Sequence, residues 1–270
     1  MKNRQYKYLM ENPSEARRLD IKTIPEDVID QATWAGVQPG MSVADVGCGS
    51  GKTTETLHRL VAPGGWVVGI DRSEERLEHA RKDNTQSGIT YTNRDITRPL
   101  DDLGTFDFVW IRFVLEYYRR ESRDIVKNIS GLVKPGGILC LIDLDYNSLT
   151  HFGIDPVLET TICNLTKELE ESHNFDPYCG RKLYSFLYEE GYQEIEVKVS
   201  AHHIIYGHLR DADLFNWSKK LEVVGAQLRY PFSEYEGGMD EFKKRFIEYF
   251  KDPKRFIYTP LICCSGRKPL

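Results

Sequence analysis

Short apolar runs alternate with amphipathic stretches through the first half of this 270-residue chain. A run that is apolar without interruption predicts a strand covered on both faces, and such strands form parallel sheets with helices between them. The expected strands are residues 42–46, 66–70, 89–92, 106–111 and 137–144, with helices at 53–61, 73–86 and 123–133. The pattern therefore predicts an α/β fold with helices on both faces of a mostly parallel sheet.

Further elements lie before and after this alternating region. Periodic apolar positions predict helices, and continuous apolar runs predict two more strands. The expected helices are residues 25–37, 156–172, 181–190, 213–227 and 239–250, and the expected strands are 194–206 and 256–265.

A glycine-rich loop follows the first expected strand, in the sequence VADVGCGSG. Glycines bring backbone amides close to a ligand, which dinucleotide, nucleotide and adenosyl sites all require. A dinucleotide site needs the pattern G-x-G-x-x-G, but Gly47 and Gly49 are followed by Lys52 where the third glycine belongs. A P-loop begins with glycine at the position held by Val46, inside the strand. The spacing therefore disfavours both NAD and nucleoside triphosphates.

The motifs around this loop, taken in order, resemble those of the class I S-adenosylmethionine-dependent methyltransferase family. The series is VADVGCGSG, VVGID, RDI, FDFVWIRFVLEY and LVKPGGILCLID, between Met41 and Asp143. The resemblance implies a Rossmann-like seven-stranded sheet with a final antiparallel strand, which residues 256–265 would supply. It also implies S-adenosyl-L-methionine as methyl donor and S-adenosyl-L-homocysteine as product.

We expect one structural domain built from three segments. These are an N-terminal helical segment at 1–40, an S-adenosylmethionine-binding core at 41–145, and the C-terminal half of the sheet at 146–270. Residues 146–180 and 210–252 are expected to form helical lids over the strand ends, because open α/β sheets bind ligands there.

Five cofactor contacts are expected in and near the first two strands. The absent side chains of Gly47, Gly49 and Gly51 would let the donor lie against the backbone. By resemblance, Asp45 supports the amino end of the donor, although it also suits a turn-fixing role. Asp71 lies 20 residues beyond Gly51, where a carboxylate accepts ribose hydroxyls; the same residue also suits a helix cap.

The remaining expected cofactor contacts are Arg72, Asp95, Ile96 and Arg112. By resemblance, Asp95 holds the adenine amino group and Ile96 covers the ring, with a plain turn role for Asp95 as the alternative. Arg112 is expected to pair with a carboxylate of donor or substrate; its alternative is an ion pair with Glu116, four residues on.

The acceptor contacts are expected at the ends of the fourth and fifth strands. Candidate substrate contacts are Phe113, Tyr117 and Tyr146, and candidate catalytic bases are His151, Glu116 and Asp145. His202 and His203 are adjacent in a strand, so at most one of them is expected to face the cleft. No metal site is expected, because the histidines, cysteines and acids show no spacing typical of a metal site.

The function expected from these residues is methyl transfer to an oxygen, nitrogen or carbon nucleophile of a small molecule. A non-catalytic sensor of S-adenosylmethionine or S-adenosylhomocysteine is the alternative, because the donor motifs suit both. A formal net charge of −5 disfavours nucleic acid as partner, and the aminopurine-DNA signature DPPY is absent. The chain has neither a signal peptide nor an apolar stretch of membrane-spanning length, so no membrane partner and a cytoplasmic location are expected. The oligomeric state stays open.

Overall fold

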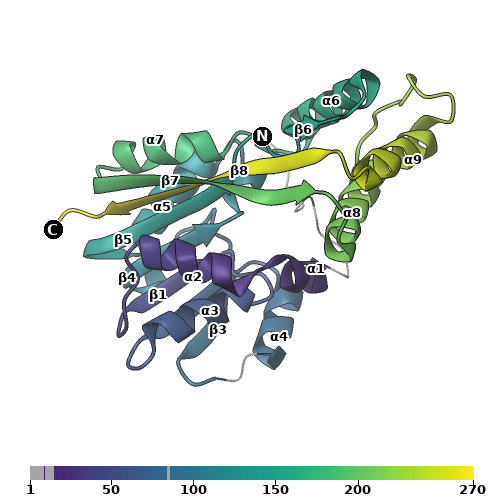
Figure 1. The fold of residues 1–270 in the computed structure, drawn as a ribbon. Helices are drawn as coiled ribbons and strands as arrows, with labels where there is room; N and C mark the ends of the chain where they lie inside the picture. Colours follow the sequence, from purple (N-terminus) through teal and green to yellow (C-terminus); the bar gives the residue numbers. More distant parts are fainter. Residues whose placement is uncertain (1–8, 10–14, 84–85) are drawn as a thin grey trace.

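The computed structural model describes residue 9, residues 15–83 and residues 86–270. Part of the expected N-terminal helical segment lies outside these residues. Within it, α1 (Glu15–Lys22) and α2 (Pro25–Trp34) precede the sheet. Both helices lie beside the sheet in Figure 1.

One mixed sheet forms the centre of the molecule (Figure 1). Its parallel part has the order β3-β2-β1-β4-β5. These strands are β1 (Ser42–Val46), β2 (Trp66–Asp71), β3 (Ile89–Asn93), β4 (Phe106–Arg112) and β5 (Val133–Leu144). The predicted α/β class and the mostly parallel sheet are confirmed.

The antiparallel part of the sheet is completed by the end of the chain. β8 (Phe256–Arg267) inserts between β5 and β7 (Gln193–Tyr206) and is antiparallel to both. The expected antiparallel last strand is therefore present. The sheet has eight strands and not seven, because the two-residue β6 (His151–Phe152) pairs with the first residues of β8.

Helices cover both faces of this sheet, and β1 shows why. Its alternate side chains point to opposite faces. Val43 packs with apolar residues of α2 and α3 (Lys52–Val61), and Ala44 and Val46 pack with those of α5 (Ser122–Ser130) and α7 (Leu183–Glu189). Another helix, α4 (Glu74–Asp83), contacts β2 and β3.

The start of β5 differs from the expectation. The predicted helix through residue 133 ends at Ser130, and the strand begins at Val133 and not at residue 137. The strand continues through Pro135 because the pairing shifts there: Phe106 pairs with Val133 and Phe108 with Ile138. Proline has no amide hydrogen to donate, and such an irregularity accommodates it.

A second apolar core lies beyond the end of the sheet, among α6 (Pro156–Ser172), α8 (Asp211–Gln227) and α9 (Gly238–Lys251). These helices gather at one end of the molecule, with α1 beside α8 (Figure 1). None of the helices in residues 15–83 and 86–270 combines the length and apolarity needed to cross a membrane.

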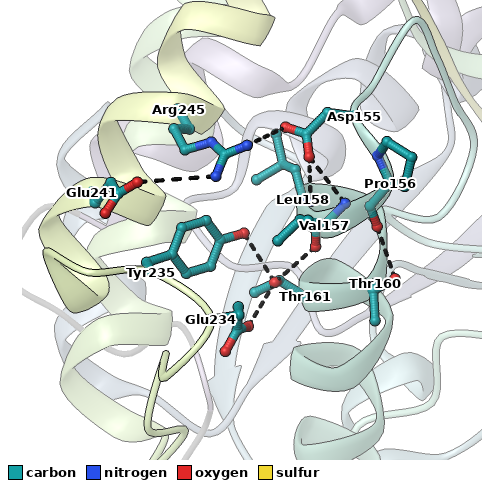
Figure 2. Close-up of polar contacts among 10 residues, drawn as sticks. All are labelled: Asp155, Pro156, Val157, Leu158, Thr160, Thr161, Glu234, Tyr235, Glu241 and Arg245. Carbon is teal, nitrogen blue, oxygen red and sulfur yellow. Dashed lines mark hydrogen bonds and ion pairs between the residues drawn. The ribbon is translucent and has the colours of Figure 1, made fainter.

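Polar contacts fasten α6 to α9 (Figure 2). Asp155 caps α6 by accepting hydrogen bonds from the amides of Val157 at 2.9 Å and Leu158 at 3.1 Å, and its second oxygen pairs with Arg245 of α9 at 3.1 Å. The hydroxyl of Thr161 donates to a carboxylate oxygen of Glu234 at 2.7 Å, in the segment that enters α9. The first turn of a helix leaves backbone amides without hydrogen-bond partners, and the Asp155 cap supplies them. The same carboxylate therefore caps α6 and holds α9 against it.

Candidate functional site

The glycine loop adopts a backbone that only glycine readily adopts. Gly47, Gly49 and Gly51 have φ values of 77°, 55° and 85°, in the left-handed region. A Cβ on Gly47 would overlap the side chain of Val114. The amides of Gly47 and Cys48 donate to the carbonyl of Ile70 at 2.7 and 3.0 Å, so the loop is fastened to the end of β2.

Asp71, at the end of β2, holds the other side of the loop. Its Oδ2 accepts a hydrogen bond from the amide of Gly49 at 3.0 Å. Its Oδ1 accepts from the amide of Ser73 at 2.8 Å and from Arg76 Nη2 at 3.0 Å. A carboxylate has about four lone-pair positions, and donors within the described residues occupy three of them. Asp71 therefore fastens the glycine loop to the turn that leads into α4, and its contact with a donor stays a prediction.

A cavity of about 120 Å³, open on one side, lies above this loop. It is lined by α1, the glycine loop, and the residues that follow β2, β3 and β4. The lining residues are Arg18, Leu19, Lys22, Thr23, Gly47, Cys48, Gly49, Ser50, Lys52, Thr53, Asp71, Arg72, Arg76, Arg94, Ile96, Arg112, Phe113, Val114, Tyr117 and Tyr118.

The contribution of α1 to this cavity was not anticipated from the sequence. Leu19 lies so close to Gly49 that a Cβ there would meet its Cδ1 at 2.9 Å. Arg18 and Lys22 face the same cavity. The only sequence signal is a short helix with basic residues four apart, a pattern common on solvated surfaces.

The structure gathers eight of the predicted site residues around the cavity and leaves seven outside its lining. Those that line it are Gly47, Gly49, Asp71, Arg72, Ile96, Arg112, Phe113 and Tyr117. Those outside the lining are Asp45, Gly51, Asp95, Glu116, Asp145, Tyr146 and His151.

Asp45 lies buried beneath the glycine loop. Its Oδ2 accepts a hydrogen bond from the hydroxyl of Thr54 at 2.6 Å. Burial raises the pKa of Asp45 to about 7, with Asp71 adding to the effect and the Thr54 hydrogen bond opposing it. Through Thr54, the carboxyl of Asp45 therefore supports the start of α3, next to the glycine loop. Its pKa also means that this carboxyl changes charge near neutral pH.

Asp95 and Arg112 have clear protein partners. Oδ1 of Asp95 accepts hydrogen bonds from the amide and hydroxyl of Thr97, at 2.9 and 2.7 Å, which is a turn interaction. Arg112 donates from Nε to Gln31 at 2.9 Å, and its guanidinium lies 4.1 Å from the ring centroid of Phe113. Within the described residues Arg112 forms no ion pair with Glu116, and it remains at the cavity wall.

The three candidate bases lie in different surroundings. Glu116 is buried and accepts a hydrogen bond from Asn147 Nδ2 at 2.7 Å. Asp145 accepts two hydrogen bonds from Arg181, at 2.8 and 3.0 Å, which neutralise its charge. The guanidinium of Arg181 also lies over the ring of Tyr146, 4.6 Å from the ring centroid. Tyr146, a predicted substrate contact, is exposed.

His151 is packed into the helical end of the molecule. Its Nε2 lies 2.9 Å from the carbonyl of Ser148, and its Nδ1 lies 3.3 Å from the hydroxyl of Tyr249. Burial lowers the pKa of His151 to about 4. Its ring also packs edge-on against Trp217, so the histidine serves the packing of α8 and α9.

Neither His202 nor His203 lines a cavity, but the strand alternation that would place them on opposite sides is absent. Their ring centroids are only 3.9 Å apart. The alternation fails because the pairing of β7 with β8 shifts between His202 and Ile205, and His203 has φ of 51°. The ring of His202 lies 5.1 Å from that of Phe113, beside the cavity.

A second, apolar cavity of about 100 Å³ adjoins the first, and Tyr117 lines both. It lies among α6, α8 and α9. Its other lining residues are Leu9, Asn147, Ser148, Ile162, Leu165, Thr166, Leu169, Phe175, Trp217, Lys220, Leu221, Val223, Val224, Phe242 and Phe246. The arrangement gives a polar compartment over the glycine loop and an apolar compartment beside it.

One cluster of acids and histidine lies between α1 and α4, outside both linings. Nε2 of His79 lies 2.9 Å from Oδ2 of Asp20 and 3.4 Å from Oδ2 of Asp83. Within residues 15–83 and 86–270 this is the one group of three such side chains close enough to share an ion. No residue spacing typical of a metal site points to this cluster.

Comparisons with known proteins match the domain that carries the glycine loop. A family model described as a methyltransferase domain matches residues 44–141. The ubiquinone biosynthesis O-methyltransferase of Colwellia psychrerythraea is 35% identical over 102 residues, which make up 37% of this chain and 40% of that protein. The first curated relatives are matched over only 36 to 45% of their length.

Two solved structures show the same fold. A putative methyltransferase from Bacillus halodurans superposes with a TM-score of 0.58 at 19% identity, covering 91% of this chain and 100% of that chain. The phosphoethanolamine N-methyltransferase 2 of Haemonchus contortus, solved with S-adenosyl-L-methionine, has a TM-score of 0.52 at 15% identity and covers 91% of this chain and 53% of that chain. Residues 44–141 therefore match a methyltransferase domain, and the fold of the chain is shared with solved methyltransferases.

Proposed function

We propose that this protein transfers a methyl group from S-adenosylmethionine to an oxygen, nitrogen or carbon nucleophile of a small molecule. The observation that carries the proposal is the pair of adjoining cavities. One lies over the glycine loop and Asp71, the other is apolar, and Tyr117 lines both. A donor in the first cavity and an acceptor in the second would meet at this tyrosine.

The residues of the first cavity suit an adenosyl donor. The left-handed glycines leave the backbone bare where a Cβ would crowd the space above the loop. The carboxylate of Asp71 suits a ribose hydroxyl, and the buried Ile96 offers an apolar surface for the adenine ring. The guanidinium of Arg112 suits the donor carboxylate. In this scheme Asp95 acts indirectly, by shaping the turn that carries Ile96.

The protein's part in such a transfer is alignment and exclusion of water. The sulfonium of the bound donor supplies an already activated methyl group, so the chain has to orient the acceptor and keep the site dry. We assign the covering role to α1 and to the lids formed by α6, α8 and α9. Of the candidate bases, Glu116 lies nearest to this point in the chain, next to Tyr117, and its partner Asn147 lines the apolar cavity.

A sensor of the donor or its product is the second candidate function. It is favoured by one observation: Asp71 is the one carboxylate among the residues that line the first cavity, and its oxygens serve the loop. A protein that only binds the donor needs no base at the acceptor. Turnover with any acceptor would exclude this candidate.

Calorimetric titration with S-adenosylmethionine and S-adenosylhomocysteine tests the proposal, followed by product detection with a panel of small acceptors. We expect Asp71→Ala to weaken both titrations by at least about tenfold, because it removes a buried acceptor that also fastens the loop. Asp101→Ala, an exposed acid away from the cavity, is the matched control. Equal binding by wild type and Asp71→Ala would remove the donor assignment.

A further inference from the structure

A group of basic side chains lies around the two cavities: Lys22 lines the polar cavity, Lys220 lines the apolar one, and His202 and His203 pack nearby. We call Lys22, Lys220, His202 and His203 the basic cluster. Nζ of Lys22 lies 4.5 Å from the ring centroid of Phe113, and His202 packs against the same ring at 5.1 Å. His203 stacks on His202 at 3.9 Å. Elements far apart in sequence, α1 and β7, thus bring these groups together.

Lys220 enters the cluster from α8. Its Nζ lies 4.5 Å from the ring centroid of Trp217, and the side chain lines the apolar cavity together with Tyr117. Lys220 does not line the donor cavity. The positive charge of Lys220 helps to lower the pKa values of Lys22, His202 and His203.

The two lysines carry more positive charge than the surrounding protein balances. Within the described residues, neither ammonium group forms an ion pair with a carboxylate. Glu116 is the one acid that acts on both. Burial beside Glu116 holds the pKa of Asp143 well above its ordinary value, which disfavours a second negative charge there. Arg18 adds positive charge, although it hydrogen-bonds to Glu15 at 2.7 and 2.8 Å.

The pKa values of the lysines show the cost of this imbalance. Burial lowers the pKa of Lys22 to about 7, with repulsion from Arg18 adding to it. Burial lowers the pKa of Lys220 to about 8, although Glu116 opposes the effect. An ammonium group in a low-dielectric site is costly unless an opposite charge pairs with it, so the site favours an anion.

The histidines pack behind the lysines, with the ring of His202 against Phe113. Nε2 of His202 and Nδ1 of His203 are buried and lack a hydrogen-bond partner within the described residues. His202 is only 8% exposed. Neither histidine lines either cavity, so these nitrogens add polarity behind Phe113, and Lys22 and Lys220 are the cluster members that reach the cavities.

We infer that the basic cluster binds an anionic group of the acceptor, while the apolar body of the acceptor fills the cavity among α6, α8 and α9. The inference rests on the proposed function and narrows its substrate class to amphipathic anions, with a carboxylate or phosphate beside Lys220. Lys220 lines the apolar cavity and not the cavity over the glycine loop. The anion beside Lys220 is therefore distinct from the donor carboxylate. The methyl-accepting atom then lies close to the anionic end, near Tyr117.

The test uses decanoate and decanol, which share an apolar chain and differ in charge. Each is titrated into the full-length protein, with and without saturating S-adenosylhomocysteine. We expect decanoate to bind at least about tenfold more tightly than decanol, since a charge-assisted pair contributes more than a neutral one. We expect Lys220→Met to weaken decanoate about tenfold and leave decanol unchanged, and Lys220→Arg to keep the preference. Lys219→Met is the matched control, because Lys219 is the adjacent residue and pairs with Glu222 at 2.7 Å.

Several outcomes would overturn the inference. Equal binding of decanoate and decanol by the wild type would do so, as would equal losses in the Lys220→Met and Lys219→Met variants. A third outcome assigns the cluster to the donor: Lys220→Met weakens S-adenosylhomocysteine, leaves methylthioadenosine (which lacks the carboxylate) unchanged, and leaves decanoate unchanged. Failure of the wild type to bind S-adenosylhomocysteine refutes the proposed function instead, and the titrations without it still report on the cluster.

Discussion

The stability of the protein should depend on the charge of Asp45, and Asp45→Asn isolates that dependence. The carboxyl is 2% exposed, and burial raises its pKa to about 7. In the unfolded chain an aspartate titrates near about 3.9. Between these two values the folded state holds a proton that the unfolded state has released, so stability is lost as pH rises.

The size of this loss follows from the two pKa values. At about 1.4 kcal/mol per pH unit, moving from about 4 to about 7 corresponds to about 4 kcal/mol, an upper figure because local relaxation reduces it. Asparagine has the same shape and carries no charge, and its oxygen can still accept the hydroxyl of Thr54, now 2.6 Å from Oδ2. Any free energy that the amide itself costs is independent of pH. The informative quantity is therefore how the difference in unfolding free energy between variant and wild type changes with pH.

The assay is urea unfolding of wild type and Asp45→Asn at pH 4, 5, 6, 7 and 8. We expect the variant to gain stability relative to wild type with each step up to about pH 7 and to gain no more above it. Asp101→Asn, at an exposed position, should show a constant difference. A constant difference for Asp45→Asn, or a variant that loses stability relative to wild type as pH rises, would refute the reasoning.

Three further predictions concern the loop, the lids and a buried histidine. Gly47→Ala should weaken the binding of S-adenosylhomocysteine at least about tenfold in calorimetry, because a Cβ there would overlap Val114. The control Gly40→Ala has a similar φ of 87° with open space around it, so it should cost only about 1 kcal/mol of stability and leave the affinity unchanged. Leu158→Ala should cost about 2 to 5 kcal/mol in urea unfolding, and the exposed Val157→Ala well under 1; similar values would contradict a packed core beneath the lids. His151 has a folded pKa of about 4, below about 6.5 for the unfolded chain, so wild type should lose stability relative to His151→Asn as pH falls from about 6.5 to 4. Its ring signals in NMR should stay those of neutral imidazole down to about pH 5, and a midpoint near 6.5 would be inconsistent with its burial.

The fold and the donor loop could be predicted because they depend on local patterns. Continuous apolar runs are required of strands covered on both faces, and the run Ser42–Val46 was predicted with its observed bounds. The glycine spacing excludes two of three nucleotide-type ligands because each ligand needs bare backbone at fixed positions. The ordered motifs after successive strands then identified the family, which the match over residues 44–141 supports.

The neighbours of the site could not be read from the sequence, because they depend on which distant elements meet. Arg112 hydrogen-bonds to Gln31, 81 residues away, and not to the nearby Glu116. Asp145, a reasonable base by position, has its charge paired with Arg181. The adjacent residues His202 and His203 share one side only because a bulge interrupts the strand alternation.

The sequence by itself therefore determined the sheet, the glycine loop and the class of donor, since periodicity and backbone sterics act over a few residues. Tertiary structure alone decided that α1 covers the loop, that Tyr117 lines two cavities, and that Lys22 and Lys220 come close together. The physical reason is that burial and electrostatic interactions depend on distance in space. Two lysines separated by most of the chain perturb each other only once the fold has removed the water between them.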